Sequence, residues 1–137
     1  MKKNKFSKNW VFKQKRDLYV KQSKIQGYRS RAVYKLQEIN EKFNILKNGI
    51  SVVDLGSAPG SWSQFVSRNF KNLKIVAIDL NEIEKIENIY QIKGDFTDET
   101  QQKKIIDYFG VKIDVVISDM AVNTTGNKNL DSIVTGE

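Results

Sequence analysis

A glycine-containing turn that follows a short apolar run constrains the fold of this chain more than any other feature. Residues 52–55 form the run, which includes Asp54, and the sequence continues as Gly56-Ser-Ala-Pro-Gly-Ser-Trp62. A strand that enters a helix through such a glycine loop is where open α/β sheets bind nucleotide-like ligands. A simpler interpretation is that Gly56 and Gly60 only shape a tight turn between strand and helix.

A second apolar run, residues 74–78, ends in Asp79, twenty-three residues after Gly56. An acid at this distance from a glycine loop can accept hydrogen bonds from both hydroxyls of a ribose. The glycine spacing bears on the choice of cofactor, because Ala58 stands where a dinucleotide site has its middle glycine. Pro59 also lacks an N–H that could bind a pyrophosphate. The loop therefore favours a smaller ligand without phosphate, S-adenosylmethionine, over NAD.

Composition excludes several classes of protein. The 137 residues contain neither cysteine nor histidine, so a zinc enzyme of the usual kind and a Ser-His-Asp hydrolase are both excluded. No run of apolar residues approaches the eighteen that a membrane-spanning helix needs, and the lysine-rich N-terminus lacks the apolar segment of a secretory signal. The predicted compartment is the cytoplasm, with no membrane and no metal as partners.

The net charge of +7 is concentrated at the N-terminus. Residues 1–35 hold twelve Lys or Arg and one acid, whereas residues 36–137 hold eleven basic and fifteen acidic side chains. Cations bind phosphates, and aromatic rings between them can stack on bases. Residues 1–29 are therefore predicted to be a basic, partly disordered arm that contacts RNA. The alternative is a solvated tail anchored by a few aromatic residues. The aromatic residues in question are Phe6, Trp10, Phe12, Tyr19, Tyr28 and Tyr34.

Apolar periodicity predicts an α/β fold for the rest of the chain. Helices are expected over residues 30–43, 59–70 and 97–110, and strands over 50–55, 73–78, 88–92 and 111–118. Ser30 is the expected N-cap of the first of these helices, whose predicted apolar side comprises Val33, Leu36, Ile39 and Phe43. Strands that alternate with helices argue for a parallel sheet with right-handed crossovers. Because the last strand would leave a long apolar edge, residues 30–137 are expected to be an incomplete domain.

Four blocks of the sequence, in this order, resemble the FtsJ (RrmJ) family of ribosomal RNA methyltransferases. They are Ser-Arg-Ala-Val-Tyr-Lys-Leu-Gln-Glu-Ile at 30–39, Asp-Leu-Gly-Ser-Ala-Pro-Gly-Ser-Trp-Ser-Gln at 54–64, Gly-Asp-Phe at 94–96 and Ser-Asp-Met-Ala-Val-Asn at 118–123. The resemblance implies a Rossmann-like, S-adenosylmethionine-dependent methyltransferase fold, here its N-terminal portion. It also implies methylation of a uridine ribose 2′-oxygen in large-subunit (23S) ribosomal RNA, within the large ribosomal subunit.

The same resemblance implies roles for individual residues. Gly60 and Trp62 would line the S-adenosylmethionine pocket, Asp79 would hold the ribose, Asp95 would accept from the adenine amino group, and Asp119 would lie near the sulfonium. Each role suits its residue type, because carboxylates accept from hydroxyls and amines and attract a cation. Gly94-Asp95 is also ordinary turn chemistry, which is the alternative for that acid.

The family's catalytic residues are a Lys-Asp-Lys-Glu tetrad, and Lys35 and Asp119 match its first two members. The remaining lysine and glutamate belong to a C-terminal part that this chain lacks, so the chain is expected to be truncated and catalytically impaired. Its expected partner is ribosomal RNA, and a complete protein is expected to be a monomer.

Three alternatives remain open at the level of sequence. A non-catalytic RNA-binding remnant would retain the arm without turnover. A methyltransferase of the same scaffold that acts on the ribose of tRNA or of an mRNA cap stays open, because the basic arm indicates RNA but not which RNA. A nicotinamide-dependent oxidoreductase has a similar sheet, although Ala58 and Pro59 argue against it.

Overall fold

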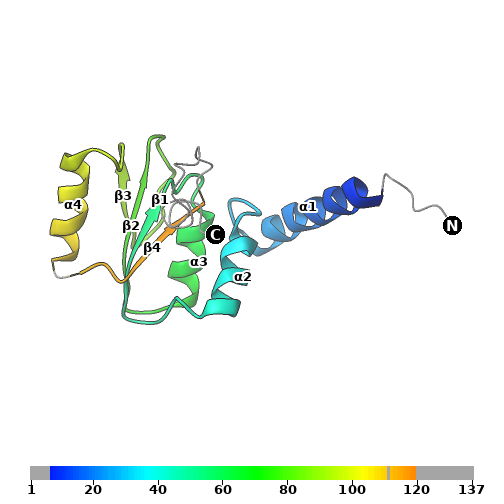
Figure 1. The fold of residues 1–137 in the computed structure, drawn as a ribbon, viewed down its shortest axis with the longest axis horizontal. Helices are drawn as coiled ribbons and strands as arrows, with labels where there is room; N and C mark the ends of the chain where they lie inside the picture. The colour runs from blue at the N-terminus through cyan, green and yellow to red at the C-terminus, as the bar shows by residue number, and fades with distance from the viewer. Residues whose placement is uncertain (1–6, 111, 120–137) are drawn as a thin grey trace, which may run out of the picture.

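The computed structural model describes residues 7–110 and 112–119 and shows an α/β fold (Figure 1). The predicted fold class, a Rossmann-like parallel sheet with flanking helices, is confirmed. Residues 120–123 of the fourth motif lie outside the described residues. In chain order the elements are α1 (Ser7–Gln26), α2 (Val33–Phe43), β1 (Ser51–Leu55), α3 (Ser61–Asn69), β2 (Lys74–Asp79), β3 (Tyr90–Lys93), α4 (Glu99–Phe109) and β4 (Val115–Ser118).

In the described part of the chain, four strands form one parallel sheet in the order β3-β2-β1-β4. Successive residues of a strand point to opposite faces of the sheet. Val52 and Ile75 therefore pack with α2 and α3, whereas their neighbours Val53 and Val76 pack with α4. Figure 1 shows α4 on one side of the sheet and α2 and α3 on the other. Helices thus cover both faces, as is usual for a parallel sheet.

The fourth strand begins later than the sequence predicts. It was expected over residues 111–118, whereas β4 comprises only Val115–Ser118, and Val111 lies outside the described residues. The carboxylate of Asp114 accepts a hydrogen bond from the Ser51 amide at 2.9 Å, while the Asp114 amide donates to the Ser51 carbonyl at 3.0 Å. Because a side chain takes the place of one ladder bond there, the regular strand begins only at the next residue.

Two further predictions, the N-cap and the apolar side of α2, differ from the structure. Its N-cap position is Ala32, which makes no side-chain cap, and the Ser30 hydroxyl instead lies 2.8 Å from the Ser61 hydroxyl. Of the predicted apolar side, Val33 and Leu36 are buried, but the side chain of Phe43 is 63% exposed. Phe43 is the last residue of α2 and is not among the residues of this helix that pack in the core, which lie between Val33 and Ile39.

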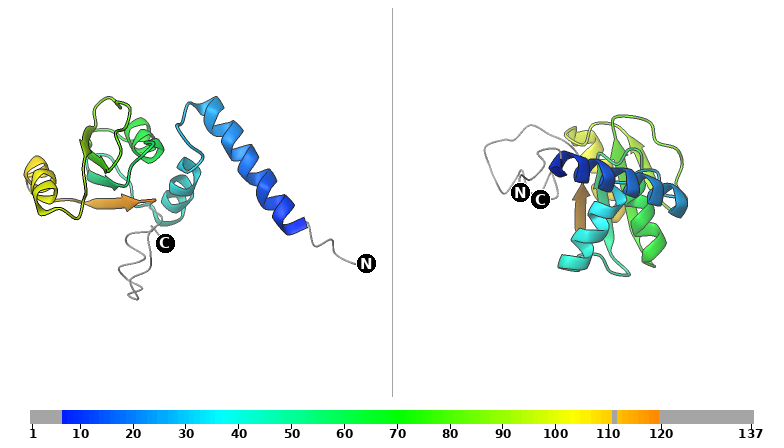
Figure 2. Two further views of the ribbon diagram at one scale, coloured as in Figure 1. Left: turned by 90° about the horizontal axis from the view of Figure 1, so that it is seen from above. Right: turned by 90° about the vertical axis from the view of Figure 1, so that its right-hand side faces the viewer.

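Within residues 1–29, which were expected to be a partly disordered arm, Ser7–Gln26 form the helix α1. This helix projects away from the sheet, and most of its side chains are exposed (Figures 1 and 2). A helix that does not pack lengthwise against a core needs no apolar stripe, so periodicity alone could not reveal it. Within the part of the chain that the structure describes, no helix is both long enough and apolar enough to cross a bilayer.

Arg68 of α3 fixes the C-terminal end of α1 to the body of the protein. Its guanidinium donates to the carbonyls of Gln26 at 3.0 Å and Gly27 at 2.9 Å. The same group lies over the ring of Tyr28, 4.6 Å from its centroid. A cation at the C-terminal end of a helix satisfies carbonyls that have no partner within the helix. The direction in which α1 leaves the body is therefore set by defined contacts.

Two substitutions in α2 test the packing of this helix. Leu36→Ala removes a side chain that is 1% exposed, so the free energy of unfolding should fall by about 2–5 kcal/mol because a cavity replaces the lost contacts. Phe43→Ala, on the same helix but exposed, should change it by less than about 0.5 kcal/mol. Urea unfolding followed by circular dichroism measures both, and equal losses would contradict the assigned packing.

Candidate functional site

The parallel sheet brings the predicted site residues to one edge, where all four strands have their carboxyl ends. Asp95 follows β3, Asp79 ends β2, Gly56 follows β1 and Asp119 follows β4. The strand order β3-β2-β1-β4 therefore fixes their lateral order along the edge. Crevices outside the carboxyl ends of such strands are the usual ligand sites of open α/β sheets.

Backbone hydrogen bonds and Asp79 shape the glycine loop. The amides of Gly56 and Ser57 both donate to the carbonyl of Ile78, at 2.9 and 3.1 Å. Asp79 accepts from the Ala58 amide at 3.0 Å through Oδ2 and from the Asn81 amide at 2.8 Å through Oδ1. A carboxylate oxygen can accept more than one hydrogen bond. The half-buried Asp79 thus holds the loop and retains capacity for a ligand.

Gly60 and Trp62 have different surroundings. Gly60 is buried with φ +116°, which favours glycine, and a Cβ atom there would lie 2.8 Å from Ile86 Cδ1, so any other residue would also have to displace the Ile86 side chain. Trp62 is buried in the core on the α2 side, where its indole N–H donates to the Ala32 carbonyl at 2.7 Å. The side chain of Trp62 therefore fixes α3 against α2, and its backbone lies in the first turn of α3, next to the loop.

Asp95 lies exposed at the carboxyl end of β3. Its Oδ1 atom accepts from both the amide and the hydroxyl of Thr97, at 2.9 and 2.7 Å. These hydrogen bonds hold the pKa of the Asp95 carboxyl below its usual value. Both bonds end on Oδ1, so the turn role and a ligand-binding role through Oδ2 are compatible.

Asp54 is a site residue for which the sequence suggested no role. Its carboxylate is buried in β1, two positions before Gly56, and accepts from the Ser63 hydroxyl at 2.7 Å. Burial raises the pKa of Asp54 to about 7, the two hydrogen bonds from Ser63 oppose the rise, and the charges of Asp119 and Asp79 add to it. The available signal was an acid within an apolar strand.

Arg29 is a second residue that the sequence did not single out. Its guanidinium donates to the carbonyls of Pro59, Glu84 and Lys85 at 3.0, 2.8 and 3.0 Å, and its amide donates to Gln64 Oε1 at 2.8 Å. One side chain thus ties the glycine loop to the loop that follows β2. In the sequence Arg29 is one of many cations in a basic segment, and nothing there separates it from the others.

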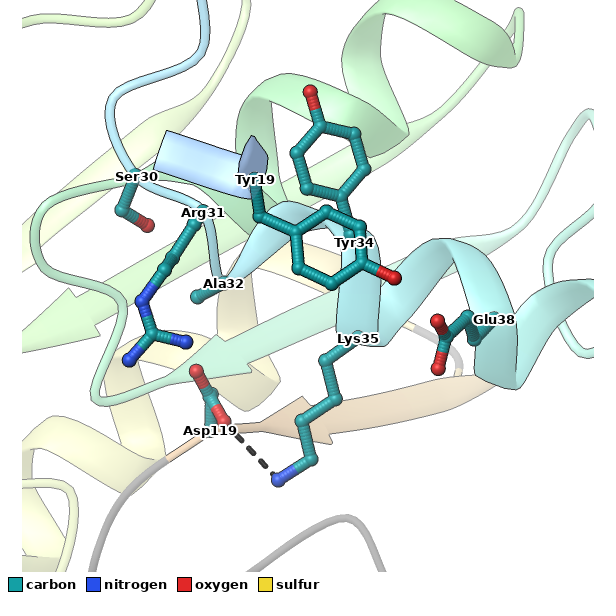
Figure 3. A pocket seen from close by; sticks show the side chains of 8 residues that line it. All are labelled: Tyr19, Ser30, Arg31, Ala32, Tyr34, Lys35, Glu38 and Asp119. Atoms are coloured by element: carbon teal, nitrogen blue, oxygen red, sulfur yellow. Dashed lines mark hydrogen bonds and ion pairs between the residues drawn. The ribbon is translucent and has the colours of Figure 1, made fainter. Parts of the chain in front are cut away.

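Lys35 and Asp119, 84 positions apart in the chain, meet beside the glycine loop. Lys35 Nζ lies 3.4 Å from Asp119 Oδ1, and both side chains remain partly exposed. The pair borders a pocket of about 520 Å³ between α1, α2 and the end of β4 (Figure 3). Among the residues that the structure describes, no group of three or more Asp, Glu, His or Cys could hold a metal ion. The pocket is lined by Tyr19, Ser30, Arg31, Ala32, Tyr34, Lys35, Glu38 and Asp119.

Comparisons with known proteins show the family to which the chain belongs. A family model described as FtsJ-like methyltransferase matches residues 28–136. The chain is 64% identical to ribosomal RNA large subunit methyltransferase E of Pelagibacter ubique, over all of this chain and 68% of the relative. It is 45% identical to the protein of that name from Zymomonas mobilis, over 94% of this chain and 58% of the relative. The chain thus spans 58–68% of the length of these two relatives.

A solved structure is similar as well. The crystal structure described as a ribosomal RNA methyltransferase from Plasmodium falciparum matches with a TM-score of 0.63 and 36% sequence identity. The match covers 77% of this chain and 63% of that one.

The buried Asp54 carboxyl predicts an unusual dependence of stability on pH. Its pKa is higher in the folded than in the unfolded state, so between the two values the folded state binds more protons and stability falls as pH rises. From pH 5 to 8 this group should lower the free energy of unfolding by up to about 3 kcal/mol, since one pKa unit corresponds to about 1.4 kcal/mol. The chain has no histidine to obscure the effect.

Urea unfolding at pH 5 and pH 8 measures this difference. Asp54→Asn, which keeps an oxygen that can accept from Ser63, should remove this decrease. Asp107→Asn, which changes an exposed acid of α4, should keep the wild-type pH dependence. Parallel pH profiles for wild type and Asp54→Asn would show that the carboxyl is ionised throughout.

Proposed function

This chain belongs to the FtsJ-like methyltransferase family, and we propose that it forms the cofactor-binding part of an enzyme that methylates a uridine ribose 2′-oxygen in large-subunit ribosomal RNA. The methyl donor is S-adenosylmethionine. The observation that carries the proposal is the Lys35–Asp119 pair at the end of β4, together with Asp79 at the end of β2, which accepts from the Ala58 amide of the glycine loop. Arg29, the cation that contacts the loop, directs its guanidinium to three carbonyls.

The order of acids along the sheet edge supports S-adenosylmethionine as the ligand. Neighbouring strands lie about 4.8 Å apart, so β3 and β4 are separated by roughly 14 Å, which suits an extended nucleoside with an amino-acid tail. Asp95 would accept from the adenine amino group, Asp79 from the ribose hydroxyls, and Asp119 would lie near the sulfonium. By the family pattern, the backbone of Gly60 and the first turn of α3 at Trp62 would border the ligand.

When bound, the cofactor supplies the methyl group, and the residues of the chain must position the accepting hydroxyl. Lys35 can donate a hydrogen bond to a ribose oxygen that enters the pocket, and Asp119 holds the Lys35 ammonium in place at 3.4 Å. The second lysine and the glutamate implied by the family pattern are not matched in this chain. We therefore expect the 137-residue protein to bind its ligands and to transfer methyl groups slowly.

The basic helix α1 supports ribosomal RNA as the partner. Its lysines and aromatic side chains are exposed along a helix that projects from the body (Figure 2). Cations spaced along such a helix can neutralise phosphates, and exposed rings can stack on unpaired bases. The same features fit the second candidate, an RNA-binding protein without turnover. Only an assay of the chemistry separates the two.

A matched pair of substitutions tests cofactor binding. In Asp95→Asn the side-chain amide oxygen can take the place of Oδ1 and keep both contacts with Thr97. The amide NH2 group, a donor, then occupies the position of Oδ2, which would accept from adenine. Affinity for S-adenosylmethionine, measured by titration calorimetry, should fall about tenfold or more, because a donor then faces a donor. Asp98→Asn makes the same change of charge three residues away and keeps a good N-cap for α4, so affinity should change less than twofold. Equal effects, or no binding by wild type, would contradict the assigned site.

A single-turnover assay tests the whole proposal. The protein, in excess over large ribosomal subunits that lack the modification, is incubated with methyl-labelled S-adenosylmethionine, and the labelled nucleoside is identified. Slow formation of 2′-O-methyluridine is expected. If cofactor and subunit bind but no label is incorporated, the result would favour the non-catalytic RNA-binding protein. Label found only in tRNA would show that the substrate is tRNA and would contradict the proposed ribosomal substrate.

A further inference from the structure

We propose that Tyr19 of α1 stacks on the base of the nucleotide that is methylated, so that the helix supplies a wall of the substrate pocket as well as cations for phosphates. This inference rests on the proposed function and adds the position and state of the target base. It begins from the composition of the 520 Å³ pocket, in which Tyr19 is the residue that α1 contributes. The other lining residues come from residues 30–38 and from the end of β4.

Tyr19 is held in place by a stack of its own. Its ring lies 5.2 Å from that of Tyr34, at an interplanar angle of 26°. Tyr34 is only 7% exposed, and its hydroxyl donates to Gln26 Oε1 at 2.6 Å, so it forms a fixed support. Tyr19 itself is 36% exposed and borders the pocket. A ring supported on one side and accessible to a ligand on the other is a suitable stacking platform for a base.

The charged side chains of the pocket favour one orientation of the bound nucleotide. Arg31 and Glu38 lie on opposite sides of Lys35 (Figure 3). A phosphate is attracted to the guanidinium and repelled by the carboxylate, so the backbone of the RNA should pass on the Arg31 side. Arg31 differs in this respect from Arg29, whose guanidinium is directed to carbonyls of two loops. With the ribose at Lys35 and Asp119, the base has Tyr19 as its aromatic neighbour.

This arrangement restricts the substrate to a nucleotide that is out of its own stack. A base cannot stack on Tyr19 while it remains between its neighbours in a helix, so the target must be unpaired or rotated outward. Without the contact to Tyr19, the ribose 2′-oxygen could reach Lys35 while the base stayed stacked in its helix. The stack therefore specifies an unpaired nucleotide as the substrate.

Photo-crosslinking tests the contact without relying on turnover. Large-subunit ribosomal RNA transcribed with 5-iodouridine is bound to the full chain and irradiated, and the crosslinked residues are identified by mass spectrometry. Iodouracil crosslinks efficiently to aromatic rings stacked on it, so a crosslink at Tyr19 is expected. Tyr19→Phe, which keeps the ring, should retain the yield at this position within about twofold, whereas Tyr19→Leu should lower it by roughly fivefold or more.

Phe12→Leu is the matched control, because Phe12 is an exposed aromatic residue of the same helix that does not line the pocket. Its loss should leave the crosslink at position 19 unchanged. Circular dichroism establishes that each variant folds, which is expected because Tyr19 is partly exposed.

Two other outcomes would overturn the inference. If wild type binds both the RNA and S-adenosylmethionine but crosslinks only through other residues of α1, the stacking contact is wrong and the proposed function stands. If wild type binds neither ligand, the proposed function fails, and the stacking contact fails with it.

Discussion

Parallel pairing of β1 with β2 and with β4 is the interaction on which the rest of the structure depends. The register places Leu55 beside Ile78 and Ser118, so that the three strands end at a common edge. The residues at the ends of these strands therefore lie at one crevice: the glycine loop after β1, Asp79 at the end of β2 and Asp119 after β4. Strand pairing places Asp119 at this edge, and the packing of α2 on the sheet places Lys35 there, so that residues separated by 84 positions lie 3.4 Å apart. An antiparallel strand would deliver its carboxyl end to the opposite edge of the sheet.

Polar groups close to the crevice hold the loops that the sheet leaves irregular. Arg29 satisfies three loop carbonyls, and Asp79 satisfies two loop amides. Asp54 of β1 is buried and accepts from Ser63, and a charge on its carboxyl is costly in that position. When it is ionised, this carboxyl adds to the negative charge of Asp79 and Asp119. A cationic ligand would relieve that repulsion, whereas a phosphate would increase it.

Much of the fold could be predicted because local patterns determine it. The strand predicted over residues 50–55 and the helix predicted over 97–110 agree with β1 and α4 to within two residues at each end. Two predictions were wrong because a side chain forms a hydrogen bond with a residue far away in the sequence, and not the local bond that was expected. Ser30 contacts Ser61 instead of capping α2, and Asp114 delays β4 through Ser51. Helix α1 was missed because a projecting helix need not show an apolar period.

For the site, the sequence by itself determined the types of residue available: glycines in a tight turn, acids after apolar strands, and no histidine or cysteine. Chain order and strand chemistry therefore predicted Asp79, and the family pattern pointed to Lys35 and Asp119. The tertiary structure alone decided that Arg29 serves the loops, that Asp54 is buried with a pKa near 7, and that Tyr19 borders the pocket of Lys35. Burial, pKa and stacking depend on neighbours that only the folded chain brings together.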